Sequence, residues 1–152
     1  MSATFATTEQ VDPRGVRFGA GASSVVLATV LATESAWLLA AQAAVFALGA
    51  LAGPGRSPYS LLFATVVRPR LGPPDELEPA GPPRFAQAVG LAFALAGVIG
   101  LAAGATLVGM VATGLALVAS LLNAVTGFCL GCEMYLLIRR FIHTSRHAHT
   151  EV

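Results

Sequence analysis

The chain has 152 residues, of which 55% are apolar and only 11% are charged. Soluble domains carry about 25% charged residues, and a chain this short exposes much of its surface. The composition therefore excludes an ordinary soluble domain and indicates a membrane-embedded one. The net charge of +1 is too small to indicate a nucleic-acid partner, and the length favours a single domain.

The first predicted element is a transmembrane hairpin. An apolar run over residues 18–33 is interrupted by Glu34 and Ser35 and resumes over residues 36–52. Each run is close to the lower limit of about 17–25 residues for a spanning helix, so we expect a tight turn at Glu34. Gln42 is an isolated polar residue within the hairpin, and an interhelical hydrogen bond is its simplest role.

A short connector and a linker follow the hairpin. Residues 59–67 form an apolar run that ends at Arg68. Nine residues of helix cannot cross about 30 Å of hydrocarbon, so we expect this run to lie in the membrane interface. Residues 71–83 are rich in proline and acidic residues, which predicts an extended aqueous linker.

Residues 85–128 contain no charged residue. A straight helix of this length would measure about 66 Å, roughly twice the hydrocarbon thickness. The segment must therefore fold back, and we expect the turn at Gly104-Ala105-Thr106. Gly97, Gly100 and Gly104 have the three- and four-residue spacing that lets membrane helices approach closely.

Matching segments occur in both halves: an Arg-Phe pair, a small-residue segment at the hairpin end, and a short apolar run. The Arg-Phe pair is Arg17-Phe18 in the first half and Arg84-Phe85 in the second. The small-residue segment covers residues 48–53 and 122–127, and the short apolar run covers residues 59–67 and 134–142. We predict an all-α membrane protein with four transmembrane helices. They form two parallel hairpin repeats, each followed by a short interfacial helix.

The predicted membrane domain covers residues 17–142. It comprises repeat 1 (about 17–70), the proline-rich linker 71–83 and repeat 2 (about 84–142). A tail of residues 1–16 precedes it, and a polar, histidine-containing tail of residues 143–152 follows.

The arginines predict the orientation. With four spans, all nine lie on the side of the termini and the connector, whereas the opposite turns carry only Glu34. They are Arg14, Arg17, Arg56, Arg68, Arg70, Arg84, Arg139, Arg140 and Arg146. The positive-inside rule then predicts a multi-pass protein of the bacterial inner membrane, with both termini and the cysteines at the cytoplasmic face.

Cys129 and Cys132, the only cysteines of the chain, are the candidate catalytic residues. A Cys-x-x-Cys pair closes a disulfide without distant backbone movement and often has a lowered thiol pKa. If a helix starts at Glu133, its dipole favours a thiolate at the pair. Glu133 and Asn123 are possible auxiliaries, Glu133 as a proton relay. In the cytoplasm the pair should rest reduced.

Three roles of the pair remain open: thiol redox or sulfur-relay chemistry, simple packing, and metal binding. A zinc site needs about four ligands, so metal would require a dimer or the tail residues His143, His147 and His149. We expect no metal and no cofactor. No strand–helix alternation indicates a thioredoxin domain. A quinone-coupled disulfide generator would place its cysteines on the oxidising side, which conflicts with the predicted orientation.

Four segments of the chain are distinctive. They are Val-Asp-Pro-Arg-Gly at residues 11–15, Arg-Ser-Pro-Tyr at 56–59, Arg-Pro-Arg-Leu-Gly-Pro-Pro at 68–74 and Gly-Phe-Cys-Leu-Gly-Cys-Glu at 127–133. Together they resemble the domain of unknown function 4395 family. The resemblance implies a small integral membrane protein of a kind widespread in actinobacteria. It also implies partners of the thioredoxin-like or rhodanese type, which tend to be encoded nearby. The Gly-Phe-Cys segment is also similar to the membrane part of some membrane-anchored rhodaneses.

The leading prediction is a cytoplasm-facing thiol redox or sulfur-transfer (sulfane or persulfide relay) component, in which one cysteine attacks and the other resolves. The alternative is a non-enzymatic membrane anchor or small transport component with structural cysteines. The expected partners are the lipid bilayer, a cytosolic thioredoxin-like or rhodanese-type protein and further copies of the chain.

Overall fold

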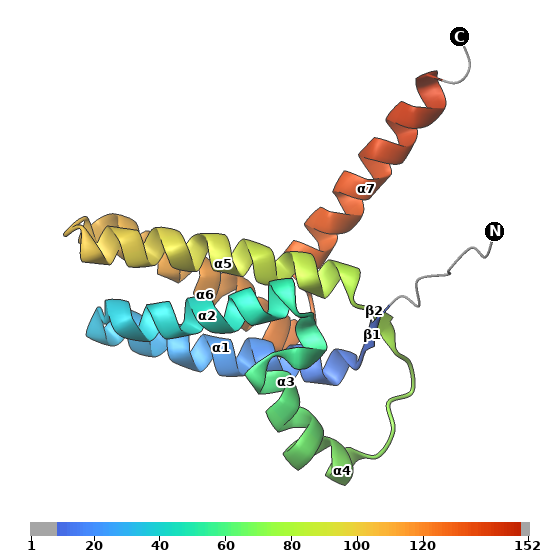
Figure 1. The fold of residues 1–152 in the computed structure, drawn as a ribbon, viewed down its shortest axis with the longest axis horizontal. Coiled ribbons are helices and arrows are strands. Elements are labelled where there is room, and N and C mark those ends of the chain that lie inside the picture. The colour runs from blue at the N-terminus through green and yellow to red at the C-terminus, as the bar shows by residue number, and fades with distance from the viewer. Residues whose placement is uncertain (1–8, 150–152) are drawn as a thin grey trace.

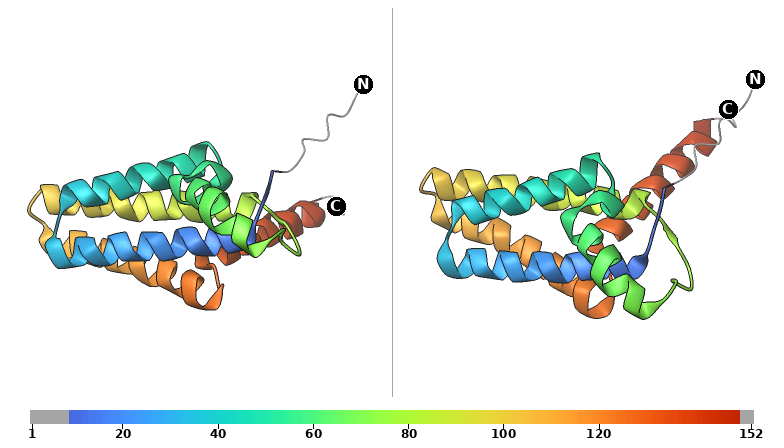
Figure 2. Two further views of the ribbon diagram at one scale, coloured as in Figure 1. Left: turned by 90° about the horizontal axis from the view of Figure 1, so that it is seen from below. Right: turned by 60° about the horizontal axis from the view of Figure 1, so that its bottom comes forward.

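The computed structural model describes residues 9–149 and has an all-α membrane domain built on four antiparallel helices (Figure 1). The helices are α1 (Pro13–Thr33), α2 (Ala36–Leu51), α5 (Gly81–Ala102) and α6 (Thr106–Thr126). Helix α1 lies beside α6, α2 lies beside α5, and α5 also packs on α6. Both hairpin turns lie at one end of the bundle, and the connectors lie at the other (Figure 2).

Three helices, α1, α5 and α6, are long and apolar enough to cross a membrane, whereas α2 is a shorter apolar helix of 16 residues. Large apolar side chains cover the outside of the bundle. Examples are Val25, Ile99, Leu107, Val118 and Val125, each more than half exposed. A surface of this kind would be a large apolar patch in water. It matches lipid instead.

Both predicted hairpin turns are confirmed. Glu34 ends α1 in a left-handed conformation (φ 52°), and the Ser35 hydroxyl accepts a hydrogen bond from the Leu38 N–H at 3.2 Å. Helix α5 ends at Ala102, and Gly104 (φ 78°) makes the turn into α6. That backbone conformation is easily adopted by glycine, which has no Cβ.

Small residues let the helices approach closely in the core. A Cβ on Gly100 would lie 2.6 Å from the Gly109 nitrogen, and one on Gly97 would lie 2.6 Å from the Leu39 side chain. The predicted packing role therefore holds for Gly97 and Gly100, whereas Gly104 has no atom within 4 Å of such a Cβ and serves the turn.

The interhelical hydrogen bond predicted for Gln42 is confirmed. Its amide nitrogen donates to the Ser23 hydroxyl of α1 at 3.0 Å, and its amide oxygen accepts from the Tyr59 hydroxyl at 2.7 Å. Gln42 is 1% exposed. The network joins α1 and α2 to the connector that follows them, which contains Tyr59.

After α2, the connector is almost continuously helical. It comprises η1 (Pro54–Arg56), α3 (Pro58–Leu62), the π-helix η2 (Phe63–Val67) and α4 (Arg68–Leu71). The linker then pairs with the start of the chain: β1 (Gln10–Val11) and β2 (Glu78–Pro79) form a short antiparallel ladder. The extended character predicted for the linker is thus confirmed at these residues.

Two helices begin earlier than predicted. Helix α1 starts at Pro13 instead of residue 17, and α5 starts at Gly81 instead of residue 84. The physical reason is that proline, although excluded from helix interiors, fits the first turn. The Asp12 carboxylate caps α1 by accepting from the Arg14 N–H at 2.9 Å.

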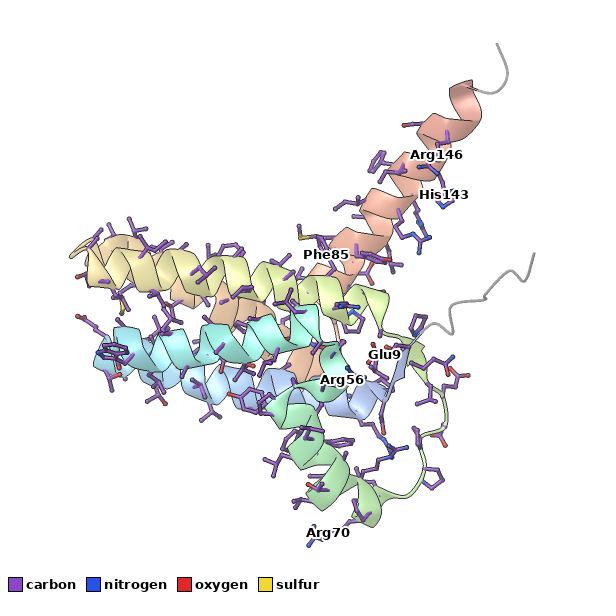
Figure 3. The ribbon with its side chains drawn as sticks, in the orientation of Figure 1. Glu9, Arg56, Arg70, Phe85, His143 and Arg146 are labelled. Carbon is purple, nitrogen blue, oxygen red and sulfur yellow. A yellow bond between two sulfur atoms is a disulfide. The ribbon has the colours of Figure 1, made fainter. Side chains whose placement is uncertain are left out.

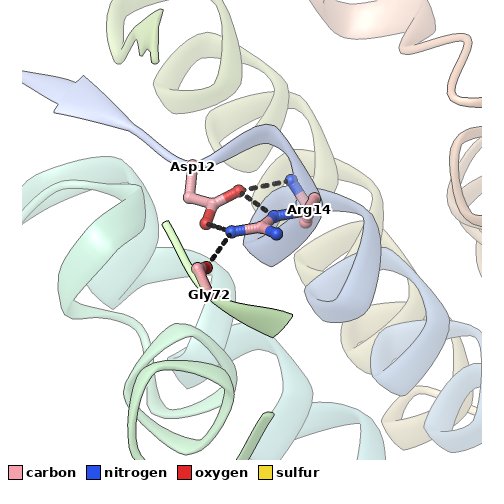
Figure 4. A network of polar contacts seen from close by, with 3 residues as sticks. All are labelled: Asp12, Arg14 and Gly72. Carbon is pink, nitrogen blue, oxygen red and sulfur yellow. Dashed lines mark hydrogen bonds and ion pairs between the residues drawn. The ribbon is translucent and has the colours of Figure 1, made fainter. Parts of the chain in front are cut away.

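Asp12 and Arg14 also tie α1 to the linker (Figure 4). The Arg14 guanidinium donates to both carboxylate oxygens of Asp12, at 3.0 and 3.1 Å, and to the Gly72 carbonyl at 3.0 Å. The hydrogen bond from the Arg14 side chain holds the pKa of Asp12 below its ordinary value. The base of the bundle is therefore fixed by a bidentate ion pair.

The last helix, α7 (Leu130–His149), projects obliquely away from the bundle (Figure 1). It is longer than the predicted run of residues 134–142, because the residues expected to form a polar tail continue the helix. Five of its exposed apolar side chains form a helical stripe, Met134, Leu137, Ile138, Phe141 and Ile142, whereas Leu136 is exposed on another face. Such an amphipathic helix suits a membrane interface.

Candidate functional site

The cysteine pair lies where α6 passes into α7. Gly127 ends α6 in a left-handed conformation (φ 76°), and its N–H donates to the Asn123 carbonyl. Helix α7 then begins at Leu130, three residues before the predicted start at Glu133. Cys129 therefore occupies the capping position, and Cys132 lies in the first turn.

The hydrogen bonds of Cys129 are those of a helix cap. Its sulfur accepts from the Cys132 N–H at 3.2 Å, and its carbonyl accepts from the Glu133 N–H at 3.0 Å. This places the Cys129 sulfur at the positive end of the α7 dipole. When the pair is reduced, both effects stabilise a thiolate at Cys129.

Cys129 and Cys132 are joined by a disulfide, with their Cα atoms 5.2 Å apart. This distance lies within the usual range for disulfides, about 4.4–6.8 Å. The structure thus holds the pair in its bonded form, whereas a cytoplasmic position predicts a reduced resting pair. The backbone accommodates the bond without opening the start of α7.

The first connector contains the same arrangement with oxygen in place of sulfur. Ser57 precedes α3, and its hydroxyl accepts from the Ser60 N–H at 3.2 Å. The Ser57 carbonyl accepts from the Leu61 N–H at 3.0 Å, and the two hydroxyl oxygens lie 3.0 Å apart. Ser57-x-x-Ser60 thus makes the contacts that Cys129-x-x-Cys132 makes after the second hairpin.

The start of α7 is packed tightly on α5. A Cβ on Gly131 would lie 2.6 Å from the Cβ of Ala86, so only glycine fits. The rings of Phe85 and Tyr135 meet beside this contact, with their centroids 5.8 Å apart. The tight packing fixes the cysteines relative to α5.

Cys129 borders a partly open cavity of about 290 Å³ at the side of the bundle, where the lining residues Leu115 and Met134 are exposed. Its walls come from α1, α2, α5, α6 and the start of α7, and they are mostly apolar. The polar residues that line it are Ser23, Gln87, Ser120 and Asn123. A smaller cavity of about 140 Å³ near Asp12 is not bordered by either cysteine.

Asn123 is the polar residue that stands out in this cavity. It is 9% exposed, and its side chain has no hydrogen-bond partner among residues 9–149. Ser120 lies one turn earlier on the same face of α6 and also lines the cavity. Asn123 and Cys129 thus line the same cavity, whereas Cys132 does not.

The other predicted auxiliary, Glu133, is not part of this arrangement. It is an exposed residue of the first turn of α7 and does not line the cavity. His143 is exposed on α7 (Figure 3), and the side chains of His147 and His149 lie outside the described residues. Within the described part of the chain, no group of three or more His, Cys, Asp or Glu residues has metal-binding geometry.

Three lining residues, Ser23, Gln87 and Ser120, were missed by sequence reasoning. Each is a single polar residue within an apolar helix, and such residues also occur where helices simply pack. The three-residue spacing of Ser120 and Asn123 was the available signal, because it places both on one helix face.

Comparison with known proteins gives one family match. The family model described as "Domain of unknown function (DUF4395)" matches residues 11–140. No curated protein and no solved structure matches the chain. Since the family model covers most of the 152 residues, the chain belongs to the domain of unknown function 4395 family.

Proposed function

We propose that this protein is a membrane-embedded thiol–disulfide component that works through Cys129 and Cys132. The main support for this proposal is the comparison of the cysteine pair with Ser57 and Ser60 of the first connector. Serine makes the same capping contacts at 3.2 Å, and it is the better hydrogen-bond acceptor, since thiol sulfur is a weak one. Capping therefore does not require cysteine. Redox or sulfur chemistry does.

The proposal includes a four-span orientation with the pair at the cytoplasmic face. Helix α2 crosses with the others, since its 16 residues extend about 24 Å and it runs beside α5 between the two ends of the bundle. The arginine-bearing segments gather at the end opposite the hairpin turns, as Arg56, Arg70 and Arg146 illustrate (Figure 3). This asymmetry supports a cytoplasmic position for the arginine-rich end of the bundle, where the cysteine pair lies.

The proposal also treats the bundle as two hairpin repeats, and reciprocal arginine contacts support this. Arg17 of the first hairpin donates to the carbonyls of Ala124 and Val125 at the end of α6, at 3.2 and 3.3 Å. Arg84 of the second hairpin donates to the carbonyls of Ala50 and Leu51 at the end of α2. The arginine at the start of each hairpin thus donates hydrogen bonds to the helix that ends the other hairpin.

The aromatic contacts, in contrast, lie within each repeat and correspond to one another. Phe18 meets Phe63 of the first connector at 5.7 Å, and Phe85 meets Tyr135 of α7 at 5.8 Å. Ser57 to Phe63 and Cys129 to Tyr135 both span six residues. The connector helix and α7 are therefore proposed to be equivalent, each starting at the membrane interface.

The proposed reaction partner is a cytosolic protein with a reactive thiol, of the thioredoxin-like or rhodanese type. In one direction, either cysteine attacks a disulfide of the partner, one partner thiol leaves, and the other cysteine displaces the second partner thiol as the Cys129–Cys132 bond forms; in the reverse direction, a partner thiol attacks that bond. With a persulfide partner, the attacking cysteine takes up the outer sulfur and the partner's thiol leaves. Both cysteines are partly exposed, so the pair has access to a partner at the end of the bundle. The proposed substrate class is thus a protein disulfide or sulfane sulfur.

Trapping tests this function. The Cys132→Ser and Cys129→Ser variants each keep one thiol. In one of them, this thiol is expected to retain a partner as a mixed disulfide, or to carry a persulfide after the partner has left, and reductant reverses either product. The matched control is the double variant with serine at both positions, which should retain none. If neither single variant captures a cytosolic thiol protein, the proposed function is wrong.

A second candidate function is that of an anchor or small transport component. The exposed apolar stripe of α7, with Arg139 and Arg140 on the same helix, favours it because such helices bind anionic membrane surfaces. Under this alternative, the double serine variant fully complements a deletion strain. Under the thiol proposal, it does not.

A further inference from the structure

The cavity beside Cys129 has the chemistry of a site for a neutral, lipid-soluble ligand. Its lining contains no Asp, Glu, Lys, Arg or His side chain, so it offers no counter-charge to an ion. Its apolar wall includes Phe46, Phe93 and Leu115. A volume of about 290 Å³ is close to the lower end of the range for small-molecule sites, about 300–1,000 Å³.

Hydrogen-bonding groups gather in this apolar space without satisfying one another. The side chain of Asn123 is nine-tenths buried and has no partner within residues 9–149. Gln87 and Ser120 line the same cavity, and neither side chain donates or accepts a hydrogen bond within the described part of the chain. Gln87 and Ser120 are partly exposed, and no fully buried side-chain nitrogen or oxygen atom lacks a hydrogen-bond partner within the described residues. The unpaired groups of this cavity are therefore open to its space and can pair with a ligand.

We propose that the cavity binds a lipid-soluble quinone that accepts electrons from the Cys129–Cys132 dithiol. The inference rests on the proposed thiol function and names its electron acceptor. A quinone ring is neutral and flat and fits between apolar walls, and its carbonyl oxygens accept hydrogen bonds from amide and hydroxyl groups such as those of Asn123 and Ser120. An acyl chain would leave these groups unpaired, which is costly in an apolar site.

The electron transfer balances without a further reactant. The two thiols lose two electrons and two protons, and the Cys129–Cys132 bond forms. The quinone takes up both electrons and both protons and becomes a quinol. The direction is the one in which quinones drive disulfide formation in the bacterial periplasm. A periplasmic disulfide generator places its cysteines on the oxidising side, as noted above, whereas the pair proposed here faces the cytoplasm. There the same reaction would drain electrons from cytosolic thiols into the membrane instead of supplying disulfides to exported proteins.

Cys129 is the cysteine that meets the quinone in this scheme. It lines the cavity, whereas Cys132 does not. Its sulfur also lies at the N-terminus of α7, where the reduced form is stabilised as a thiolate. Cys132 is then the residue left to exchange with a protein partner.

The test uses the full chain in detergent, reduced and freed of reductant under anaerobic conditions. Decylubiquinone is the probe, since its ring carbons are all substituted and it does not alkylate thiols. We expect one quinol per protein, accompanied by loss of both alkylatable thiols. In Asn123→Leu, the decylubiquinone concentration that gives half the maximal rate of this single turnover, written KM here, should rise about 3- to 10-fold, the usual worth of one neutral hydrogen bond. Exchange with oxidised glutathione is measured in the wild-type protein as the separate readout of the thiol function.

Two further variants keep the test decisive. Ser120→Ala is expected to raise KM in the same direction and serves if Asn123→Leu does not fold. Thr33→Val, an exposed change at the opposite end of α1, should leave KM unaltered.

If glutathione exchange proceeds but no quinol forms, the cavity holds something else, such as lipid, and the quinone inference is wrong while the proposed function stands. Wild-type KM in both cavity variants would place quinone outside the cavity and overturn the site. Failure of both reactions would overturn the thiol function itself.

Discussion

The ends of the two hairpins share one capping geometry but differ in the atoms that make it and in their surroundings. After the first, Ser57 caps a helix and its hydroxyl lies 3.0 Å from that of Ser60. After the second, Cys129 caps a helix and is bonded to Cys132. The capping distances, 3.2 Å to the amide nitrogen and 3.0 Å to the carbonyl oxygen, are the same at both ends.

The comparison teaches that one backbone arrangement serves two chemistries. A pair of hydroxyls can only share a hydrogen bond, whereas a pair of thiols in the same positions can be oxidised, attack a disulfide or carry sulfane sulfur. The surroundings differ as well, because only the cysteine end borders the cavity that contains Asn123. The following changes break or sharpen this comparison.

Replacing the cysteine pair after the second hairpin by the serine pair found after the first should have the largest effect, a loss of thiol exchange. The double variant Cys129→Ser, Cys132→Ser should lose thiol exchange completely. Its melting temperature should stay within a few degrees of that of the reduced wild type, since serine caps at least as well. Thermal melting in detergent and an exchange assay with oxidised glutathione measure the two properties. A large loss of stability would mean that the cysteines serve packing.

Separating α7 from α5 should be the next largest effect. Gly131→Ala places a methyl group against Ala86, with 2.6 Å between the two Cβ atoms. Overpacking of this kind costs about 1–3 kcal/mol and should also slow quinone reduction by displacing Cys129. Gly114→Ala on α6 is the control, because no atom lies within 4 Å of its added Cβ. Equal melting temperatures for the two variants would contradict the observed packing.

Removing the hydrogen bonds of either Arg17 or Arg84 to the other hairpin should lower the melting temperature by a smaller amount, similar for the two arginines. Arg17→Gln and Arg84→Gln each remove a positive charge from the C-terminal carbonyls of a helix in the other hairpin. Such a charge contributes about 0.3–1 kcal/mol, and both variants should melt below wild type by similar amounts. Arg140→Gln, on the exposed part of α7, is the matched control. A loss confined to one variant would argue against equivalent hairpins.

The helix caps made by Ser57 and Cys129 should contribute slightly different amounts to the free energy of unfolding. Ser57→Ala should cost about 1 kcal/mol. Cys129→Ala, measured against the reduced wild type, should cost less because sulfur is the weaker acceptor. Melting curves in detergent under reductant provide both values. A larger loss at Cys129 would show that its sulfur has structural partners beyond the cap.

The smallest expected effect is a dependence on pH at the base of α1. The hydrogen bond from Arg14 keeps the pKa of Asp12 below its ordinary value. Its stabilising contribution is therefore complete above the unfolded-state pKa of about 3.9 and is lost as pH falls through the lower folded-state value. Asp12→Asn should flatten the melting temperature in this acidic range. If the melting temperature of the variant fell with decreasing pH as steeply as that of the wild type, the pH dependence would come from a group other than Asp12.

Much of the fold could be predicted from the sequence because charge and helix length constrain a membrane chain strongly. Glu34, Gly104 and Gln42 were assigned correct roles, since a charge, a glycine and an amide each stand out among apolar residues. The early starts of α1 and α5 were missed, because prolines such as Pro13 suggest linkers and also fit a first helical turn.

The candidate site was predicted less completely. Cys129, Cys132 and Asn123 were selected from the sequence, but Ser120 and Gln87 join them only through the packing of α5 on α6. The similarity of Ser57-x-x-Ser60 to the cysteine pair was also missed. Serine pairs of this spacing are common in helix caps and turns, so the similarity emerges only from the matching capping distances of the folded chain.

The central claim is that Cys129 and Cys132 form a reversible redox pair at the cytoplasmic face. The most direct measurement equilibrates right-side-out and inverted vesicles in glutathione buffers of graded potential and then applies a membrane-impermeant maleimide. We predict labelling in inverted vesicles only, with both thiols appearing together as the buffer becomes more reducing. Labelling from the periplasmic side, or two cysteines that react independently of the buffer, would contradict the account.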